Sequence, residues 1–258
     1  MAAIERPRSI FLVPSAPNVG LRAAALGLVQ ALQREGIDVG FVKPIASPPS
    51  PETTDDLSCH FARTLCHIAA PTPIPFGRAE DMMRAGLLPS LMEEVVSITE
   101  SASAAHRVTV IQGLSLTDES QSNRKLNIEI ARCLSARVVL VLNARLAADQ
   151  LIEEIETASR LFGEAGAEVF AGVMLNEVPA GPEGAALIET FRSRIGALPL
   201  LAAVPYDARL DAPRLTDVVR DLGLTVERPG DMEATRVREI AVAGSAVENA
   251  VSWLKPGT

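Results

Sequence analysis

The sequence predicts an α/β protein whose doubly wound, mostly parallel sheet lies between two layers of helices. Short runs of apolar and β-branched residues alternate along the 258-residue chain with longer stretches of helical periodicity. The short runs are apolar at nearly every position, which is typical of parallel strands that are covered on both faces. Aromatic residues make up only 3% of the chain, so we expect a core of Ala, Val, Leu and Ile.

Six segments are predicted to be buried strands, because each is a short apolar run bounded by turn or helix signals. Pro199 places the last of them at a strand start or a sheet edge, since proline cannot donate a hydrogen bond to a neighbouring strand. In chain order the six segments are Ser9–Val13, Asp38–Val42, Val108–Gln112, Arg137–Leu142, Val169–Leu175 and Leu198–Val204.

The longer stretches between these strands are predicted to be helices. The segment Ala46–Pro75 interrupts the alternation, because its Ser47–Pro51 run (SPPSP) cannot form regular structure. We expect a loop there, followed by a helix over Asp55–Ile68; long loops inside compact domains are often functional. The other predicted helices are Leu21–Arg34, Leu87–Ala105, Leu126–Leu134, Ala147–Gly163 and Gly184–Ile195.

The tail of the chain follows a different pattern. Val218–Val226 predicts the end of a helix and a last strand of the main sheet, and Arg228-Pro229-Gly230 predicts a turn. A further strand over Arg236–Val242 and a helix over Ser245–Leu254 could not bury their own apolar faces. We therefore expect one domain over residues 1–227, the start of a truncated second domain over residues 228–258, and a reading frame that continues past Thr258.

Composition narrows the classes of function. The formal net charge of −8 argues against binding of the nucleic-acid backbone as a main activity. No apolar run approaches the ~20 residues that a membrane span needs. The three cysteines, Cys59, Cys66 and Cys133, are an odd number without the spacing of a disulfide framework, which indicates a reducing compartment. We expect a cytoplasmic protein that binds neither nucleic acid nor membrane.

The loop between the first predicted strand and helix has the position of a phosphate-binding loop. Such a loop, G-x-x-x-x-G-K-[ST], wraps phosphates with backbone N–H groups, neutralises them with its lysine and binds Mg²⁺ through its hydroxyl. Here Pro14–Arg22 reads PSAPNVGLR, so that Gly20 remains while Leu21 replaces the lysine and Arg22 replaces the hydroxyl residue. Taken alone, this loop is equally consistent with a plain strand-to-helix turn.

Further motifs follow in a familiar order. Lys43-Pro44-Ile45 follows the second strand, Gln112-Gly113-Leu114 follows the third, and Gly172–Asn176 (GVMLN) lies in the fifth. With Leu126–Ala131 (LNIEIA) and Ala203–Tyr206 (AVPY), they resemble the amino-terminal, dethiobiotin synthetase-like domain of long-form bacterial phosphate acetyltransferases. The resemblance covers nearly the whole chain and implies a three-layer, P-loop NTPase-like fold with a degenerate loop.

The resemblance implies a domain that regulates or assembles its parent enzyme and is not itself catalytic. The parent reaction interconverts acetyl-CoA and phosphate with acetyl phosphate and CoA. Gly230–Glu233 and Arg236-Val237 match the start of that family's DRTGG-type middle domain, and the catalytic domain would lie beyond it. The expected partners are therefore those missing domains and further copies of the chain in a homo-oligomer. Two alternatives stay open: an ATP-dependent ligase like dethiobiotin synthetase, which the degenerate loop opposes, and a purely structural oligomerisation module.

The expected site is the remnant of a nucleotide- or anion-binding pocket, with no catalytic residue and no metal. Gln112 stands where the resemblance implies a Glu that helps to bind Mg²⁺, and Asp55 or Asp56 could belong to the remnant or cap the following helix. Lys43 is either an anion contact or a surface lysine. A weak effector such as ATP, NADH or pyruvate is the only ligand expected. The candidate residues are Asn18, Val19, Gly20, Leu21, Arg22, Lys43, Gln112 and Asn176.

Several other polar residues are expected to be structural. Cys59-His60 and Cys66-His67 lie two helical turns apart, roughly 10 Å, which is too far to share a zinc ion with ligands at about 2.0–2.3 Å. His106 has no partner nearby in the sequence. Carboxylates expected on solvated surfaces are Asp118, Glu119, Glu153, Glu154 and Glu156.

Overall fold

The computed structural model describes residues 8–48, 55–117, 121–162, 170–196 and 198–238. These residues divide between two compact units, Met1–Pro205 and Tyr206–Thr258. The division falls earlier in the chain than the predicted domain boundary after residue 227, and the identity of the second unit stays a prediction. No described helix is long and apolar enough to cross a membrane.

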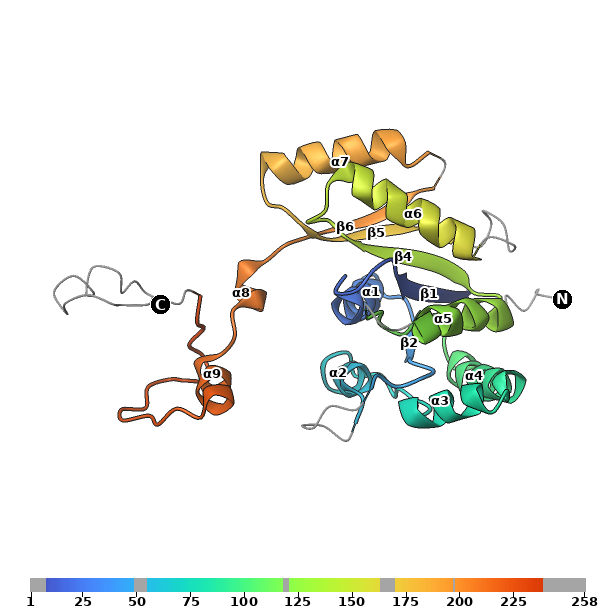
Figure 1. Cartoon of the computed structure of the whole chain (residues 1–258), viewed down its shortest axis with the longest axis horizontal. Helices are drawn as coiled ribbons and strands as arrows, with labels where there is room; N and C mark the ends of the chain where they lie inside the picture. Colours follow the sequence, from blue (N-terminus) through green and yellow to red (C-terminus); the bar gives the residue numbers. More distant parts are fainter. Residues whose placement is uncertain (1–7, 49–54, 118–120, 163–169, 197, 239–258) are drawn as a thin grey trace. The chain divides into compact units, whose positions relative to one another are not determined.

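The first unit is built on a six-stranded sheet with the order β2-β3-β1-β4-β5-β6 (Figure 1). Every neighbouring pair is parallel. All six predicted strands are confirmed, and the last lies at an edge, as Pro199 indicated. The strands are β1 (Arg8–Pro14), β2 (Val39–Val42), β3 (Val108–Gln112), β4 (Arg137–Asn143), β5 (Phe170–Val178) and β6 (Leu200–Pro205).

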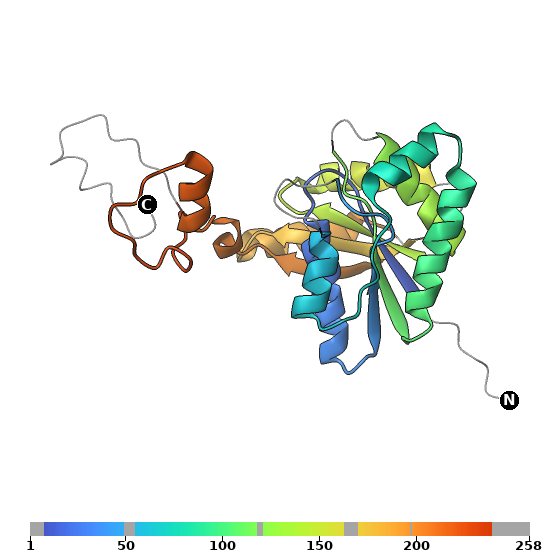
Figure 2. The same ribbon diagram turned by 90° about the horizontal axis from the view of Figure 1, so that it is seen from below.

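Helices cover both faces of this sheet (Figures 1 and 2). One face packs on α1 (Leu21–Arg34) and α2 (Leu57–Leu65), whose buried side chains share a cluster with Leu12 of β1. The opposite face, which includes Phe11 and Val13, packs on the remaining helices of the unit. These are α3 (Phe76–Arg84), α4 (Leu88–Ser103), α5 (Gln121–Leu134), α6 (Ala148–Phe162) and α7 (Pro182–Arg194). The predicted three-layer α/β/α fold is confirmed.

One helix of the first unit was not predicted. Helix α3 has the largely polar sequence FGRAEDMMR; only Ala79 is fully buried, while Phe76, Met82 and Met83 are partly buried against the core. The predicted helix over Asp55–Ile68 is shorter than expected, because α2 ends at Leu65 and His67 has a left-handed backbone (φ 55°). Both differences fall in the stretch between β2 and β3, where proline and glycine interrupt the pattern.

The carboxyl end of β3 is fixed to α5 by a side-chain amide. Asn127 accepts a hydrogen bond from the Leu114 N–H at 2.8 Å and donates one to the Leu114 carbonyl at 2.9 Å. Gly113 permits this contact, because a Cβ there would lie 2.8 Å from Asn127 Oδ1 and 3.0 Å from the Leu12 carbonyl. The LNIEIA motif therefore positions the end of β3, where Gln112 lies.

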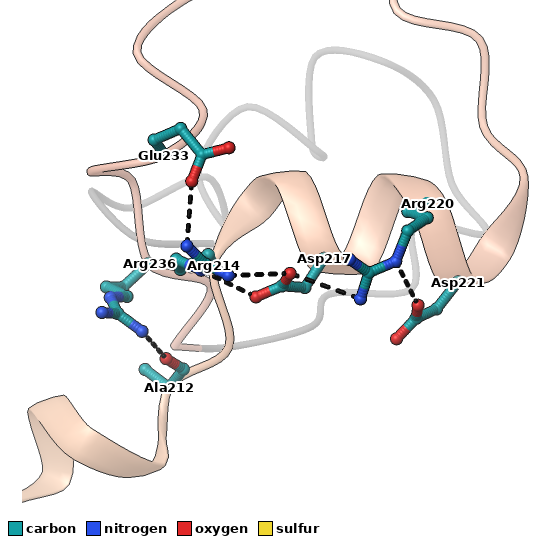
Figure 3. A network of polar contacts seen from close by, with 7 residues as sticks. All are labelled: Ala212, Arg214, Asp217, Arg220, Asp221, Glu233 and Arg236. Carbon is teal, nitrogen blue, oxygen red and sulfur yellow. Dashed lines mark hydrogen bonds and ion pairs between the residues drawn. The ribbon is translucent and has the colours of Figure 1, made fainter. Parts of the chain in front are cut away.

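The second unit contains α8 (Ala208–Asp211) and α9 (Leu215–Leu222). The start of α9 is tied to a later segment by the Arg214 guanidinium, which binds Asp217 at 2.9 Å and Glu233 at 3.0 Å (Figure 3). An isolated antiparallel bridge joins Arg214 to Arg236, and the Arg236 guanidinium donates to the Ala212 carbonyl at 3.2 Å (Figure 3).

The prediction of a last sheet strand within Val218–Val226 is wrong. Helix α9 occupies the first part of this segment and ends at Leu222, before Gly223, whose backbone is left-handed (φ 61°). All six strands of the sheet lie before Tyr206. The predicted helix over Ser245–Leu254, and all but the start of the predicted strand over Arg236–Val242, lie outside the described residues.

Replacing Asn127 with Leu should lower the free energy of unfolding by about 2–3 kcal/mol, because the Leu114 N–H and carbonyl then stay buried without partners. Urea denaturation of the two proteins measures this loss. Lys125→Ala, an exposed change on the same helix, should stay within ~0.5 kcal/mol of the parent. Equal stability of the Asn127 variant and the parent would contradict the proposed role of the amide.

Candidate functional site

The carboxyl edge of the sheet has the topology of a ligand site near β1. The connection after β1 crosses to β2 over one face, while the connection after the neighbouring β3 crosses to β4 over the other (Figure 1). Ligands of open α/β sheets bind where the connections leave in opposite directions. The degenerate loop, Lys43 and Gln112 all lie at this edge.

The loop after β1 contributes side chains to the core. Val19 and Leu21 are 2% and 4% exposed and belong to the apolar cluster beneath α1 and α2. Leu21 thus fills, as a core residue, the position at which a phosphate loop carries its lysine. Gly20 precedes the helix with a left-handed backbone (φ 71°) and supplies no side-chain cap, and Asn18 is also left-handed (φ 56°) and exposed.

Two asparagines bind the carbonyl groups of this loop. Asn176, at the end of β5, donates to the Val19 carbonyl at 2.9 Å, and Asn143, at the end of β4, donates to the Asn18 carbonyl at 3.2 Å. The Asn176 amide also lies directly over Gly20, where a Cβ would approach its Nδ2 to 2.2 Å. The amide that the sequence suggested for a nucleotide is therefore bound to the loop itself.

Lys43 forms an ion pair inside the protein. The residue is 0% exposed, and its Nζ lies 2.9 Å from Asp56 Oδ2 and donates to Ser47 Oγ at 2.6 Å. Both side chains of the pair are 1% exposed. Of the two predicted alternatives, the surface lysine is excluded by this burial. The anion that the structure gives to Lys43 is a carboxylate of its own chain.

Asp56 is the centre of this cluster. Its carboxylate accepts from the backbone N–H groups of Ser47, Ser58 and Cys59 as well as from Lys43, and so caps α2. The predicted cap is confirmed for Asp56, whereas Asp55 binds the exposed Arg63 instead. Burial alone would raise the pKa of Asp56, but the charge of Lys43 and the donated hydrogen bonds bring it below its ordinary value.

Burial has the larger effect on Lys43, whose pKa it lowers against the opposing attraction of Asp56. The nearby charge of Arg22 lowers that pKa further. Because each charge of the pair depends on the other, loss of one would leave the second buried and uncompensated. The pair therefore fixes the loop after β2 and the start of α2 against the end of β2.

Arg22 and Gln112 complete the edge of the site. Arg22 is half-buried and donates from Nε to Ser58 Oγ at 3.2 Å, while its two terminal nitrogens have no partner among the described residues. Gln112 is 2% exposed, and its Oε1 has no hydrogen-bond partner in the described part of the chain. Gln112 lies two residues after Val110 in β3, so both side chains are on the same face of the sheet, the one that α1 covers.

One expected surface carboxylate instead contacts the loop. Glu154 of α6 is half-buried and accepts a hydrogen bond from Ser15, so its prediction as a solvated residue is wrong. The sequence gave no signal for this pairing, because the two residues lie 139 positions apart. Glu153 and Glu156 are exposed as expected, and Asp118-Glu119 lies outside the described residues.

The remaining candidates have structural surroundings. Cys59 and Cys66 are buried, whereas His60 and His67 are exposed. Burial raises the pKa of the Cys59 thiol to about 12. His106 lies within 2.9 Å of Asp38 through its Nδ1, a partner 68 positions earlier in the chain. No group of three or more His, Cys, Asp or Glu residues in the described ranges could hold a metal ion.

The structure therefore brings the eight predicted residues to one edge of the sheet in three groups. Asn18, Val19, Gly20 and Asn176 form a closed turn, and Leu21 is part of the core. Arg22, Lys43 and Gln112 lie toward α2. The residues that sequence reasoning missed include Ser47 in a loop, Ser58 in the first turn of α2 and Asn143 at a strand end, polar side chains that carried no distinctive motif.

Comparison with known proteins places these features in a family. Residues 8–214 match the family model AAA_26, which describes an AAA domain. The phosphate acetyltransferase of Deinococcus radiodurans is 35% identical over 257 residues, covering 97% of this chain and 36% of that protein. The phosphate acetyltransferase of Pseudomonas putida is 32% identical, covering 97% of this chain and 37% of that protein. The predicted resemblance is confirmed, and the chain spans just over a third of the length of these relatives.

A solved structure supports the fold alone. Cell division protein FtsY from Thermotoga maritima aligns with a TM-score of 0.50 at 13% identity, over 78% of this chain and 63% of that protein. The alignment confirms the predicted P-loop NTPase-like α/β fold.

Replacing Lys43 with Met should lower the free energy of unfolding by about 3–5 kcal/mol, because Asp56 stays charged and buried. The double variant Lys43→Met/Asp56→Asn should lose less than the sum of the two single changes. Urea denaturation in a double-mutant cycle measures the coupling. Asp55→Asn, which removes the exposed pair with Arg63, should cost at most ~1 kcal/mol. Strictly additive costs for Lys43 and Asp56 would refute the coupled pair.

Replacing Gly20 with Ala should destabilise the protein more than Gly36→Ala. Both glycines have φ 71°, but nothing lies within 4 Å of a Cβ at Gly36, whereas Asn176 blocks Gly20. The backbone conformation alone costs about 1–2 kcal/mol. Thermal unfolding of the two variants gives the difference. Asn176→Ala should remove most of the excess cost of Gly20→Ala; if the two glycine variants melt alike, Asn176 does not close the loop.

Proposed function

Because the chain belongs to the AAA_26 family of AAA domains, we propose that it is a non-catalytic domain that regulates or assembles a phosphate acetyltransferase. The parent protein interconverts acetyl-CoA and phosphate with acetyl phosphate and CoA. The support is similarity over 97% of this chain to proteins of that name, of which it covers 36–37%. The chain is then the amino-terminal domain, and the residues from 228 onward begin the next domain of the same cytoplasmic protein.

The buried pair of Lys43 and Asp56 is the single observation that carries the non-catalytic part of the proposal. Lysine at a phosphate site must present its ammonium group to the ligand. Here that group is inaccessible and is bound by Asp56 and Ser47. The ion pair thus stabilises the loop after β2 and leaves the lysine unavailable to a phosphate group, which supports a non-catalytic role.

A ligase like dethiobiotin synthetase is the second candidate, and three residues oppose it. Leu21 is part of the core, Arg22 cannot bind Mg²⁺, and Gln112 has no negative charge. Transfer of a phosphoryl group depends on positioning and on neutralising charge with metal and lysine. The site lacks these elements at the positions where the fold would supply them.

An anionic effector fits the remaining polar groups better than a substrate does. The terminal nitrogens of Arg22 are unused among the described residues, and the amino end of α1 carries no side-chain cap. A guanidinium group and a helix amino end both favour a carboxylate or phosphate. We propose ATP, NADH and pyruvate as candidate effectors, and we propose no role for Mg²⁺ in their binding.

The activity of the chain and of its complete protein tests the proposal. The 258-residue chain should form no acetyl phosphate from acetyl-CoA and phosphate above the blank, whereas the complete protein, expressed from its full reading frame, should do so. Calorimetry with ATP, NADH and pyruvate, each with and without Mg²⁺, tests the effector; Arg22→Ala should abolish any binding that is seen. Acetyl phosphate formation by the chain alone, or an inactive complete protein, would overturn the assignment, and Mg²⁺-dependent ATP binding would favour the ligase.

A further inference from the structure

The apolar face of helix α9, in the second unit, is exposed at its carboxyl end. Helix α9 has the sequence LTDVVRDL, which places apolar residues at the first, fourth, fifth and eighth positions, along one face. Leu215, Val218 and Val219 of this face are half-buried. Leu222 is 67% exposed, and beyond the helix Leu224 is 54% and Val226 38% exposed. We call this exposed surface the α9 patch; its residues are Leu222, Leu224 and Val226.

The opposite face of α9 is already occupied. Arg214 binds Asp217 and Glu233, and Arg220 binds Asp217 and Asp221 (Figure 3). These contacts orient the helix within its own unit and leave Leu222, at the end of the apolar face, exposed. An eight-residue helix is marginally stable in water and normally gains its stability by packing an apolar face. The fixed polar side and the exposed end of the apolar side together indicate a docking surface.

The residues that follow α9 offer a second mode of contact, through their backbone groups. Gly223 and Leu224 close the helix, with the Leu224 N–H donating to the Val219 carbonyl at 2.9 Å. The backbone groups of the next two residues, Thr225 and Val226, have no hydrogen-bond partner among the described residues. Leu224 and Val226 alternate as in a strand, which is the pattern that predicted a strand here. An apolar extended segment with free backbone groups is suited to pairing with a strand from a partner.

We propose that the α9 patch is the docking surface for the rest of the same polypeptide, which places an apolar surface over Leu222 and a strand beside residues 224–226. The inference rests on the proposed function. The chain covers only 36–37% of the length of the phosphate acetyltransferases that it resembles, so about two thirds of such a protein lies outside it. That remainder is joined covalently, which gives it a high effective concentration at a surface in the unit nearest the junction.

Thiol labelling of the complete protein tests the inference. In a Cys133→Ser background, which removes the exposed native cysteine and leaves Cys59 and Cys66 buried, Leu222→Cys is compared in the 258-residue chain and in the complete protein. A maleimide should label it at least ten times more slowly in the complete protein. Glu153→Cys, exposed on α6, should be labelled at the same rate in both. Leu224→Cys provides a second reporter should the first variant fold poorly.

Two results would overturn the inference. Equally fast labelling in both proteins would show that the rest of the polypeptide does not cover the α9 patch. Equally slow labelling would show that the cover comes from within residues 1–258. Acetyl phosphate formation separates this outcome from the proposed function: an active protein with an open Leu222 refutes only the docking surface, and an inactive protein with a protected Leu222 refutes only the function.

Discussion

The contact between Lys43 and Asp56 is the interaction on which the edge of the first unit depends. It joins the end of β2, the loop that follows and the start of α2 through two side chains that are each 1% exposed. The desolvation cost of two buried charges is recovered only when the remaining hydrogen bonds are made, and here Ser47, Ser58 and Cys59 make them. Arg22 donates a hydrogen bond to Ser58 of α2, so the loop after β1 is also joined to the cluster around Asp56.

The loop after β1 keeps the position of a phosphate loop but has different internal bonds. In a functional loop the backbone N–H groups point at the ligand and the glycines leave room for it. Here the carbonyl groups of Asn18 and Val19 are bound by Asn143 and Asn176, and the latter amide occupies the space above Gly20. The loop is therefore held by the ends of β4 and β5, and a retained glycine serves packing at this position.

The fold could be predicted because its strands and most of its helices carry strong apolar periodicity. All six strands, and α1 over Leu21–Arg34, follow directly from that pattern. Helix α3 was not found in this way because it is short and largely polar, although Phe76, Ala79 and Met83 pack on the core. The segment after Gly223 read as a strand because its apolar residues alternate, but alternation does not specify the partner strand, and the described sheet contains no such strand.

The sequence predicted where the residues of the candidate site lie, but it did not predict which side chains they contact. Gly20, Lys43, Gln112 and Asn176 do lie along one edge, because parallel strands present their carboxyl ends together. The partners of these residues depend on side chains brought from distant parts of the sequence. Ser15 and Glu154 show this most clearly, since nothing in either local sequence specifies the other.

Leu21 has a consequence for any change that would build a phosphate loop at this position. It is 4% exposed within the cluster beneath α1, so a lysine in its place would put an unpaired charge among apolar side chains. A hydroxyl residue in place of Arg22 would likewise remove the hydrogen bond to Ser58. Each change lowers stability before any affinity for a nucleotide is gained, so the two would have to occur together with changes in the core. A phosphate loop therefore cannot be introduced here by substitutions in the loop alone.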